Sequence, residues 1–225
     1  MVLHELVADS VWFTQQPLRF GPIRLTTRMT VIRLQDGSLW VHSPVMPSPE
    51  LSAELARLGP VLYVVAPNKS HHLFFLPFMH ANPAALGFVA PGLAKKRPDL
   101  ASIPVIPRDA PWSDELPGWF IEGLPIIDET VWFHRSSGTL LLTDLLFCFG
   151  PDNTGLAAWV AGLLGVRNKL AMSRTMKLLT KDRLALRRSV EPLLSLPVKR
   201  VVLAHDQIIE NAPIEQLRKA FSWLL

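Results

Sequence analysis

Three apolar segments, each followed by a side chain that can bind a metal, constrain the fold of this chain more than any other feature. These segments have the length and composition of buried β-strands, and they are 61–66, 139–143 and 201–204. His71 and His72 follow the first segment after a Pro-Asn-Lys-Ser loop, whereas Asp144 and His205 directly follow the other two. Because strand ends often carry functional side chains, we expect a metal site along one edge of a sheet.

The rest of the chain predicts an α/β fold in one domain, residues 1–225. Segments 29–34 and 38–42 flank an Asp-Gly pair, which is typical of a hairpin. Residues 11–13 read as a short strand, and Ser48-Pro49 predicts the start of a helix. Residues 152–196 have a helical pattern that is broken near Gly165. Two β-rich stretches with attached helices favour a layered sandwich.

The composition excludes several classes of protein. The single cysteine, Cys148, excludes an internal disulfide and a cysteine-rich zinc cage, and its apolar neighbours predict an inert buried thiol. Residues 1–16 lack the pattern of a signal peptide, and no segment reaches the ~18 apolar residues of a membrane span. We therefore expect a cytoplasmic protein.

The positive charge of the chain is concentrated in one region. Residues 165–200 carry ten Lys or Arg against two acids. This stretch could face an anionic partner, or it could be a solvated helical face. The apolar segment 155–165 precedes it, so residues 155–190 could contact a membrane surface; packing on the core or on a second subunit of a homodimer is the alternative. No nucleic-acid-binding module is present, so no nucleic acid partner is expected.

The order of these features resembles the metallo-β-lactamase-like superfamily. That family places T-H-x-H-x-D-H after a core strand, and here the same positions read Ala66-Pro67-Asn68-Lys69-Ser70-His71-His72. Thr143-Asp144 and Ala204-His205 resemble its later aspartate and last histidine motifs. The chain also resembles an uncharacterised branch of that superfamily, a domain of unknown function, in segments 16–20, 39–44 and 66–68. The resemblance implies a four-layer αββα sandwich.

The departures from the family pattern fall on one of its two metal positions. Pro67 and Lys69 stand where the first two family histidines would be, and the middle histidine falls near Ile126, where none is present. The other metal position retains four competent ligands, which are His71, His72, Asp144 and His205. The resemblance thus implies one divalent metal, zinc by preference, with iron or manganese as alternatives.

Two of these ligands and four further residues have expected roles beyond binding. His71 and Asp144 are candidate catalytic residues, with His71 as a fourth ligand or a proton shuttle. The candidates for orienting ligands or contacting substrate are His42, Lys69, Glu129 and Asp206. Lys69 could instead point to solvent, and His42 could be a structural histidine.

The predicted function is a metal-dependent hydrolase with a mononuclear site and a small-molecule substrate. The alternative is a non-catalytic binding or interaction protein on the same scaffold, because three of the family's ligands are missing. A redox role with bound iron is a third hypothesis. The sequence specifies no second redox centre that would support it.

Overall fold

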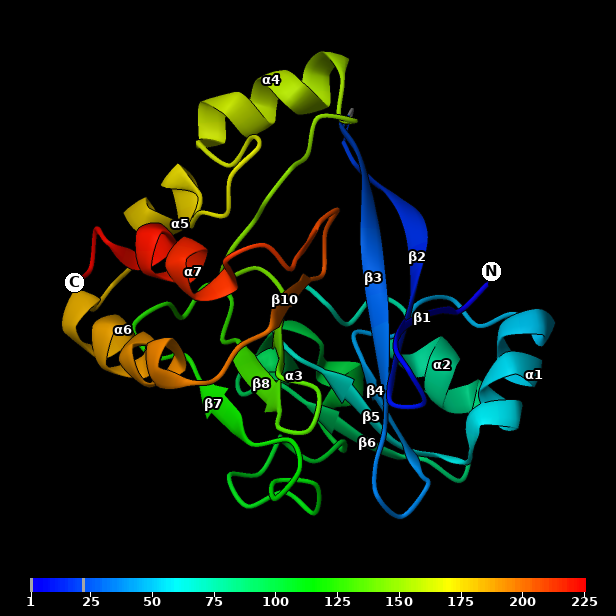
Figure 1. The fold of residues 1–225 in the computed structure, drawn as a ribbon. Coiled ribbons are helices and arrows are strands. Elements are labelled where there is room, and N and C mark those ends of the chain that lie inside the picture. Colours follow the sequence, from blue (N-terminus) through cyan, green and yellow to red (C-terminus); the bar gives the residue numbers. More distant parts are fainter. Residues whose placement is uncertain (1, 22) are drawn as a thin grey trace.

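The computed structural model describes residues 2–21 and 23–225, and two β-sheets packed face to face form its centre (Figure 1). The first sheet has the order β1-β2-β3-β4-β5-β6, with strands His4–Val7, Val11–Phe20, Ile23–Arg33, Leu39–His42, Val61–Ala66 and Leu86–Val89. The second has the order β11-β10-β9-β8-β7, with strands Ile208–Ile209, Arg200–Leu203, Thr139–Leu142, Thr130–His134 and Gly118–Phe120. Strands β4, β5 and β6 run parallel, as do β9 and β10.

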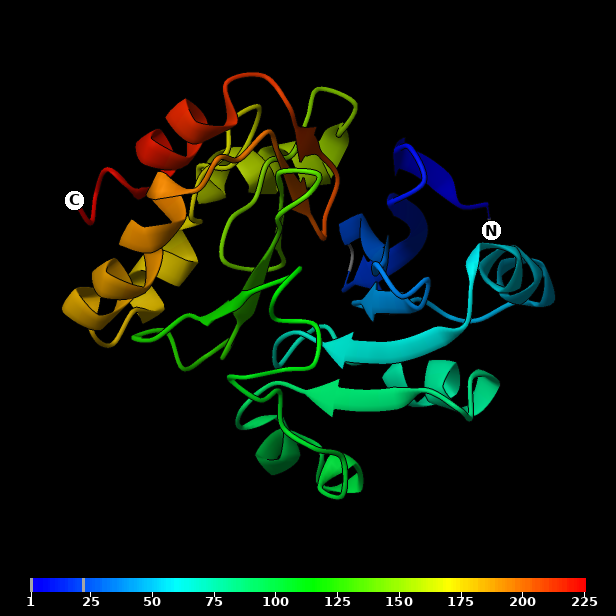
Figure 2. The same cartoon turned by 60° about the horizontal axis from the view of Figure 1, so that its bottom comes forward.

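Helices cover the outer face of each sheet (Figures 1 and 2). The helices that follow the strands of the first sheet are α1 Pro49–Leu58, α2 Phe75–Ala81, α3 Leu93–Lys96 and η1 Pro98–Leu100. Those of the C-terminal half are α4 Gly155–Leu164, α5 Arg174–Leu179, α6 Arg183–Val190, η2 Glu191–Ser195 and α7 Pro213–Phe221. Apolar clusters lie under both helical layers, and a third cluster with Trp40, Trp112 and Trp132 lies between the sheets. The four-layer αββα sandwich is therefore confirmed.

Helix α1 forms where its sequence signals predict it. The Ser48 hydroxyl accepts a hydrogen bond from the Leu51 N–H at 3.2 Å, and Leu51 and Leu55 are buried against the first sheet. Its last turn ends at Gly59, whose N–H bonds the Leu55 carbonyl. An N-cap side chain, an apolar stripe and a terminal glycine are together sufficient to define this helix.

Strand β2 is much longer than the three residues predicted from its sequence, because Pro17 lies inside it without ending it. Strand β1 pairs only with residues 11–13 of β2, so the strand beyond them is a free edge. Proline is tolerated at an edge because its missing N–H costs no ladder hydrogen bond there. The resulting long β2–β3 hairpin reaches α4 (Figure 1).

The segment 152–196 forms three short α-helices with turns between them, and α4 ends at Gly165 in a left-handed conformation. Leu156, Trp159 and Leu163 on α4 are 48%, 65% and 55% exposed, so this stripe does not pack on the core. Within residues 2–21 and 23–225, no helix combines the length and apolar character needed to cross a bilayer.

His134, at the end of β8, is expected to make stability depend on pH. Burial lowers the pKa of His134 to about 4, while its ring bonds the hydroxyls of Ser136 and Ser137. The unfolded chain takes up this proton near pH 6.5, so the stabilisation is complete above that pH and is lost as the pH falls towards 4. The free energy of unfolding falls when the pH is lowered from 8 to 4. We expect this fall to be about 2 kcal/mol smaller in His134→Gln than in the wild type.

Urea unfolding of wild type, His134→Gln and the exposed-site control His80→Gln across pH 4–8 measures this difference. Equal pH profiles for wild type and His134→Gln would contradict the assignment.

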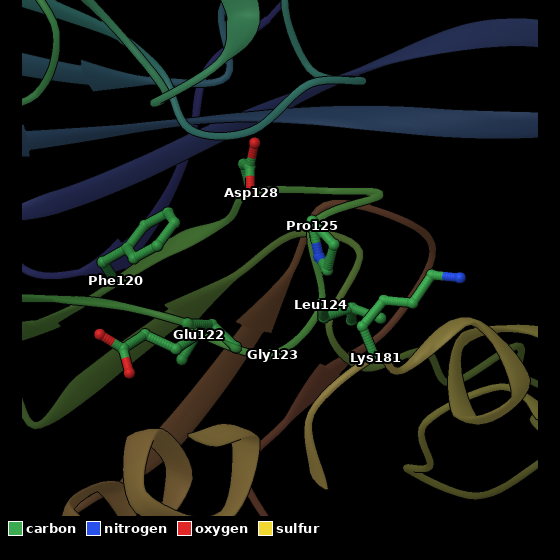
Figure 3. Close-up of a pocket in the computed structure, with 8 residues that line it drawn as sticks. Phe120, Glu122, Gly123, Leu124, Pro125, Asp128 and Lys181 are labelled. Atoms are coloured by element: carbon green, nitrogen blue, oxygen red, sulfur yellow. The ribbon is translucent and has the colours of Figure 1, made fainter. Parts of the chain in front are cut away.

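A cavity of about 330 Å³ opens beside the second sheet (Figure 3). It is lined by Phe120 at the end of β7, by the turn after β7, including Glu122 and Pro125, and by Asp128 and Lys181. It holds no group of three potential metal ligands, whereas such a group lies elsewhere in the described part of the chain.

Candidate metal centre

His71, Asp144 and His205 lie close together, although the strands that precede them belong to two different sheets. Strand β5, which precedes His71, belongs to the first sheet. Strands β9 and β10, which precede Asp144 and His205, are neighbours in the second. The prediction of a site along one edge of a single sheet is therefore wrong. The site lies where edges of two packed sheets meet, so its geometry depends on how the sheets pack.

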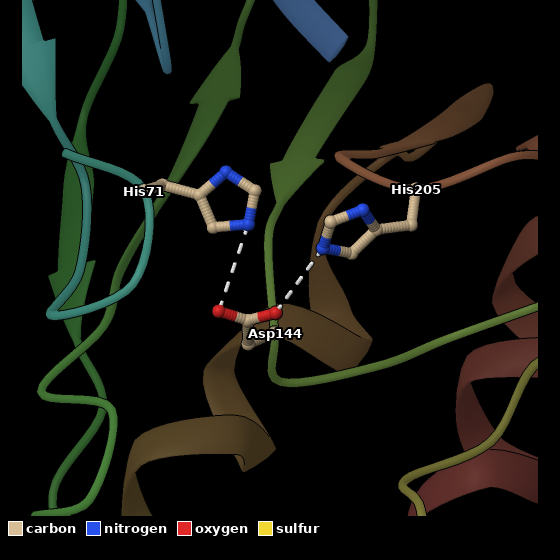
Figure 4. A group of neighbouring side chains, drawn as sticks. All are labelled: His71, Asp144 and His205. Carbon is tan, nitrogen blue, oxygen red and sulfur yellow. Dashed lines mark ion pairs between the residues drawn. The ribbon is translucent and has the colours of Figure 1, made fainter. Parts of the chain in front are cut away.

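His71, Asp144 and His205 form a compact group of potential metal ligands (Figure 4). One ligand atom from each lies within 4.8 Å of the others. The Nε2 of His71 is 3.6 Å from Oδ2 of Asp144, and the Nε2 of His205 is 3.5 Å from Oδ1. Both rings therefore present the same nitrogen to one carboxylate, and all three side chains are largely buried.

The ring of His71 is held by a hydroxyl from the neighbouring strand exit. Its Nδ1 lies 2.7 Å from the Ser43 Oγ, in a buried hydrogen bond. Ser43 directly follows β4 and has a φ of 53°, a left-handed conformation that a serine seldom adopts. Because Nδ1 is engaged, Nε2 is the ring nitrogen that faces Asp144.

The tautomer of His205 follows from its hydrogen bond to a backbone carbonyl. Its Nδ1 lies 2.7 Å from the oxygen of Thr26, which can only accept, so Nδ1 carries the proton. Neutral His205 then has its lone pair on Nε2, on the side of Asp144. Orientation of a ligating histidine by a carbonyl bonded to its other nitrogen is common in metal sites.

Arg28 on β3 connects the loop that carries His205 to the first sheet. Its guanidinium donates hydrogen bonds to the carbonyls of Leu203, Asp206 and Gln207. The backbone N–H of Arg28 donates to the Ala204 carbonyl. Burial lowers the pKa of Arg28 to about 10 despite the nearby Asp206. A buried guanidinium bound to three carbonyls keeps this loop in a single position.

Asn68 connects the turn of His71 to Asp144. Its Oδ1 accepts the N–H groups of Ser70 and His71, both at 2.7 Å, and its Nδ2 donates to Asp144 Oδ2 at 2.7 Å. The same amide also reaches Thr143 Oγ1 at 2.9 Å. Asn68 is fully buried, so these bonds are not shared with solvent. One amide therefore sets the position of two candidate ligands relative to each other.

Glu129 fixes the backbone of the segment that carries Asp144. Its fully buried carboxylate accepts the N–H groups of Thr143 and Asp144, both at 2.7 Å, and of Leu145 at 3.1 Å. Burial, followed by the charge of Asp144, raises the pKa of Glu129 to about 7, although these hydrogen bonds act in the opposite direction. The predicted accessory residue Glu129 thus lies directly behind Asp144.

Electrostatics favour an ionised Asp144. Burial alone would raise its pKa, but the neighbouring imidazoles of His71 and His205, 3.6 and 3.5 Å away, hold the pKa well below its usual range. Burial likewise acts to lower the pKa of His205, and the adjacent Asp144 carboxylate outweighs it and raises that pKa. The site therefore stabilises positive charge beside the Asp144 carboxylate, whether protons or a metal cation supply it.

His72 was predicted as a metal ligand, but it lies outside this group of three residues. Its Nδ1 is 2.9 Å from Nη1 of Arg97, and burial followed by the charges of Arg97 and Lys96 lowers its pKa to about 4. Residues 71–74 form a turn, and α2 begins only at Phe75. Adjacent side chains in this turn diverge, so only one of the two histidines reaches Asp144.

Lys69 also takes a position that its sequence context did not predict. Its Nζ forms an ion pair with Asp128 and donates to the Pro125 carbonyl at 2.8 Å. Its charge is therefore balanced within the chain by Asp128.

The remaining two candidates for orienting ligands or contacting substrate are His42 and Asp206, and both make contacts that stabilise the fold. His42 is buried between Trp40 and Trp132, with ring centroids 5.7 and 5.3 Å away, and burial lowers its pKa to about 3. Asp206 accepts hydrogen bonds from the Gly150 N–H and the Asn153 amide, both at 2.6 Å. The carboxylate of Asp206 therefore orders the loop before α4.

Sequence reasoning missed Asn68, Ser43, Thr26 and Arg28. Only Asn68 carried a usable signal, since an asparagine in a loop often bonds the backbone two residues ahead, as it does with Ser70 here. The other three act across long stretches of sequence through a hydroxyl, a carbonyl and a buried guanidinium. Nothing in their local sequence distinguishes Thr26 and Arg28 from ordinary strand residues, or Ser43 from an ordinary residue at a strand exit.

The donor set fits a small divalent cation. Two nitrogen or oxygen ligands at about 2.0–2.1 Å from a tetrahedral zinc lie about 3.3 Å apart. Here the two His–Asp pairs are separated by 3.5 and 3.6 Å through different oxygens of Asp144, and one ligand atom from each residue lies within 4.8 Å of the others, so a small closing movement would bring three ligands around one ion. Two imidazoles and one carboxylate suit zinc, and three protein ligands leave a tetrahedral position for water or substrate.

Several solved structures similar to this chain are described as metallo-β-lactamases. One from Pontibacter korlensis has a TM-score of 0.67 at 13% identity over 99% of this chain and 98% of its own. One from Erythrobacter litoralis has a TM-score of 0.66 at 13% identity, with coverage of 98% and 96%. FIM-1 from Pseudomonas aeruginosa, in the mono-zinc form, has a TM-score of 0.60 at 9% identity, with coverage of 100% and 96%.

At this identity the structural likeness shows the fold alone. No curated protein matches the sequence. The family described as "Domain of unknown function (DUF4336)" matches residues 8–157, which is more than half of the chain. The chain therefore belongs to this family, and its fold is that of the metallo-β-lactamases.

Proposed function

We propose that this protein is a metal-dependent hydrolase with a mononuclear site, in which His71, Asp144 and His205 hold one divalent cation. Zinc is the preferred ion, with iron or manganese as alternatives. The observation that carries the proposal is the convergence of one ligand atom from each residue within 4.8 Å, on a metallo-β-lactamase fold. The mono-zinc form of FIM-1 gives a precedent for one zinc ion in a protein of this fold.

The chain's own residues prepare the site for a cation. The Thr26 carbonyl leaves Nε2 of His205 free to ligate, and Ser43 holds the ring of His71. Asn68 and Glu129 set the side chain and backbone of Asp144. Such preorganisation by surrounding hydrogen bonds raises metal affinity, because little order is lost on binding.

A divalent metal bound here would lower the pKa of a water molecule and polarise a carbonyl or phosphoryl oxygen. The residues of the site would then have two roles, binding the ion and accepting a proton. They would ligate the ion through Nε2 of each histidine and one oxygen of Asp144, and the other Asp144 oxygen would be placed to accept a proton from the attacking water. The substrate class that suits this chemistry is a small ester, thioester or phosphoester.

The first experiment is elemental mass spectrometry of untagged protein purified without added metal. We expect about one zinc, iron or manganese per chain in the wild type and less than a tenth of that amount in His71→Ala/His205→Ala. The exposed-site variant His80→Ala, which also lacks one histidine, should retain the metal of the wild type. A wild type free of metal even after incubation with zinc and manganese would overturn the proposal.

A hydrolysis screen tests the second half of the proposal. We expect the metal-loaded protein to cleave at least one of a panel of chromogenic esters, thioesters and phosphoesters. The activity should disappear with chelator, return with zinc and be absent in Asp144→Asn. A protein with stoichiometric metal but no such activity would support a binding role for the same site in place of hydrolysis.

A further inference from the structure

A second cavity, of about 590 Å³, lies between α5, α7 and the loop after α4, away from the metal-ligand group in sequence and in its lining. Its volume is within the range of small-molecule sites. Four cationic side chains line it, which are Lys169, Arg174, Lys177 and Lys219, and no acidic residue is among its lining. We call this cavity the basic pocket.

The charges of the basic pocket are not balanced within the chain. Among described residues, none of its four cations forms an ion pair with a carboxylate. Arg174 donates only to the Leu163 carbonyl, and Lys177 Nζ lies 5.2 Å from the Trp223 ring centroid. By contrast, Arg187 and Arg200 on neighbouring elements each pair with a glutamate.

The cations of the pocket are also close enough to influence one another. Burial, followed by the charges of Lys169 and Arg174, lowers the pKa of Lys177 below its usual value. Like charges held together are destabilising unless an anion lies between them. A bound anion would offset this repulsion.

The rest of the lining indicates the kind of anion. Asn168, Gln216 and Ser222 add neutral hydrogen-bonding groups, and the partly exposed Leu164 and Ala171 add apolar surface. A phosphate monoester carries about two negative charges and three acceptor oxygens near neutral pH, which suits several cations better than a single carboxylate would. Lysine and arginine are the common phosphate-binding side chains.

We propose that the basic pocket binds a phosphate-bearing molecule, with its phosphate among the cations and an apolar part against Leu164 and Ala171. The phosphate could belong to a free phosphate ester or to the headgroup of an anionic lipid. The exposed apolar side chains of α4, which is joined directly to the pocket at Leu164, are compatible with the second source.

Calorimetric titration of the full chain with pyrophosphate at low ionic strength tests the free-phosphate source. We expect one site per chain, weaker at raised salt because screening reduces the attraction. Lys169→Gln/Lys177→Gln should weaken binding at least about tenfold, since it removes two charges within reach of the anion. The control Lys95→Gln/Arg188→Gln removes two exposed charges elsewhere and should bind like the wild type. Lys169→Gln alone, at an exposed position, is the fallback if the double variant unfolds.

Co-sedimentation with phosphatidylcholine vesicles, with and without phosphatidic acid, tests the lipid source. Binding to the anionic vesicles but not to pyrophosphate, lost in Lys169→Gln/Lys177→Gln and retained in the control variant, would support the pocket and assign the phosphate to a lipid. Absence of binding to both probes would overturn the proposal. Equal losses in the two double variants would also overturn it, because a general charge effect would then explain the binding.

Discussion

Replacing His205 by alanine is expected to weaken zinc binding by at least about 100-fold, the largest effect of any single change at the site. His205 supplies one of three ligand atoms, and its ring is already oriented by the Thr26 carbonyl. Loss of even an outer hydrogen-bonding partner typically costs 10–100-fold in metal affinity, and loss of a ligand costs more. Competition with a chromogenic zinc chelator measures the change.

His72→Ala is the matched control, because it removes the neighbouring histidine that the structure places beside Arg97. Its affinity for zinc should stay within about threefold of the wild type. The wild-type affinity should also fall as the pH drops, since zinc and protons compete for Nε2 of His205. Equal losses in His72→Ala and His205→Ala would contradict the three-residue site.

Replacing Glu129 by alanine is expected to lower the free energy of unfolding by about 3–5 kcal/mol. The change removes the acceptor for three buried N–H groups, those of Thr143, Asp144 and Leu145. Each unpaired buried donor costs about 1–3 kcal/mol, and partial rearrangement reduces the sum. Urea unfolding of chelator-treated protein measures the loss, with exposed-site Glu122→Ala as the control, for which a change within about 0.5 kcal/mol is expected.

The deficit of Glu129→Ala should itself depend on pH. The folded-state pKa of Glu129 is about 7, above the value of about 4.5 for a free glutamate, so folding binds a proton. The contribution of Glu129 to stability is therefore fully present below pH 4.5 and decreases as the pH rises through 7. We expect a larger deficit at pH 5.5 than at pH 8. A deficit below about 1 kcal/mol at both values would show that Glu129 does not support this segment.

Local sequence patterns were sufficient for the elements whose signals lie within a few residues of one another. The Ser48 cap and the apolar stripe of α1 define that helix, and the Asp36-Gly37 pair defines the β3–β4 turn. Strand β2 could not be predicted beyond Phe13, because its tolerance of Pro17 depends on the absence of a partner strand at that position. That information lies in the sheet and not in the segment.

The sequence by itself determined which side chains could ligate a metal and, through resemblance, the αββα fold that contains them. Only the tertiary structure decided that His71 reaches Asp144 and His205 while His72 faces Arg97, because this choice depends on a turn that Asn68 holds. It also decided that Lys69 is neutralised by Asp128. Ligand identity is a property of residue type, whereas ligand convergence depends on hydrogen bonds between segments far apart in the chain.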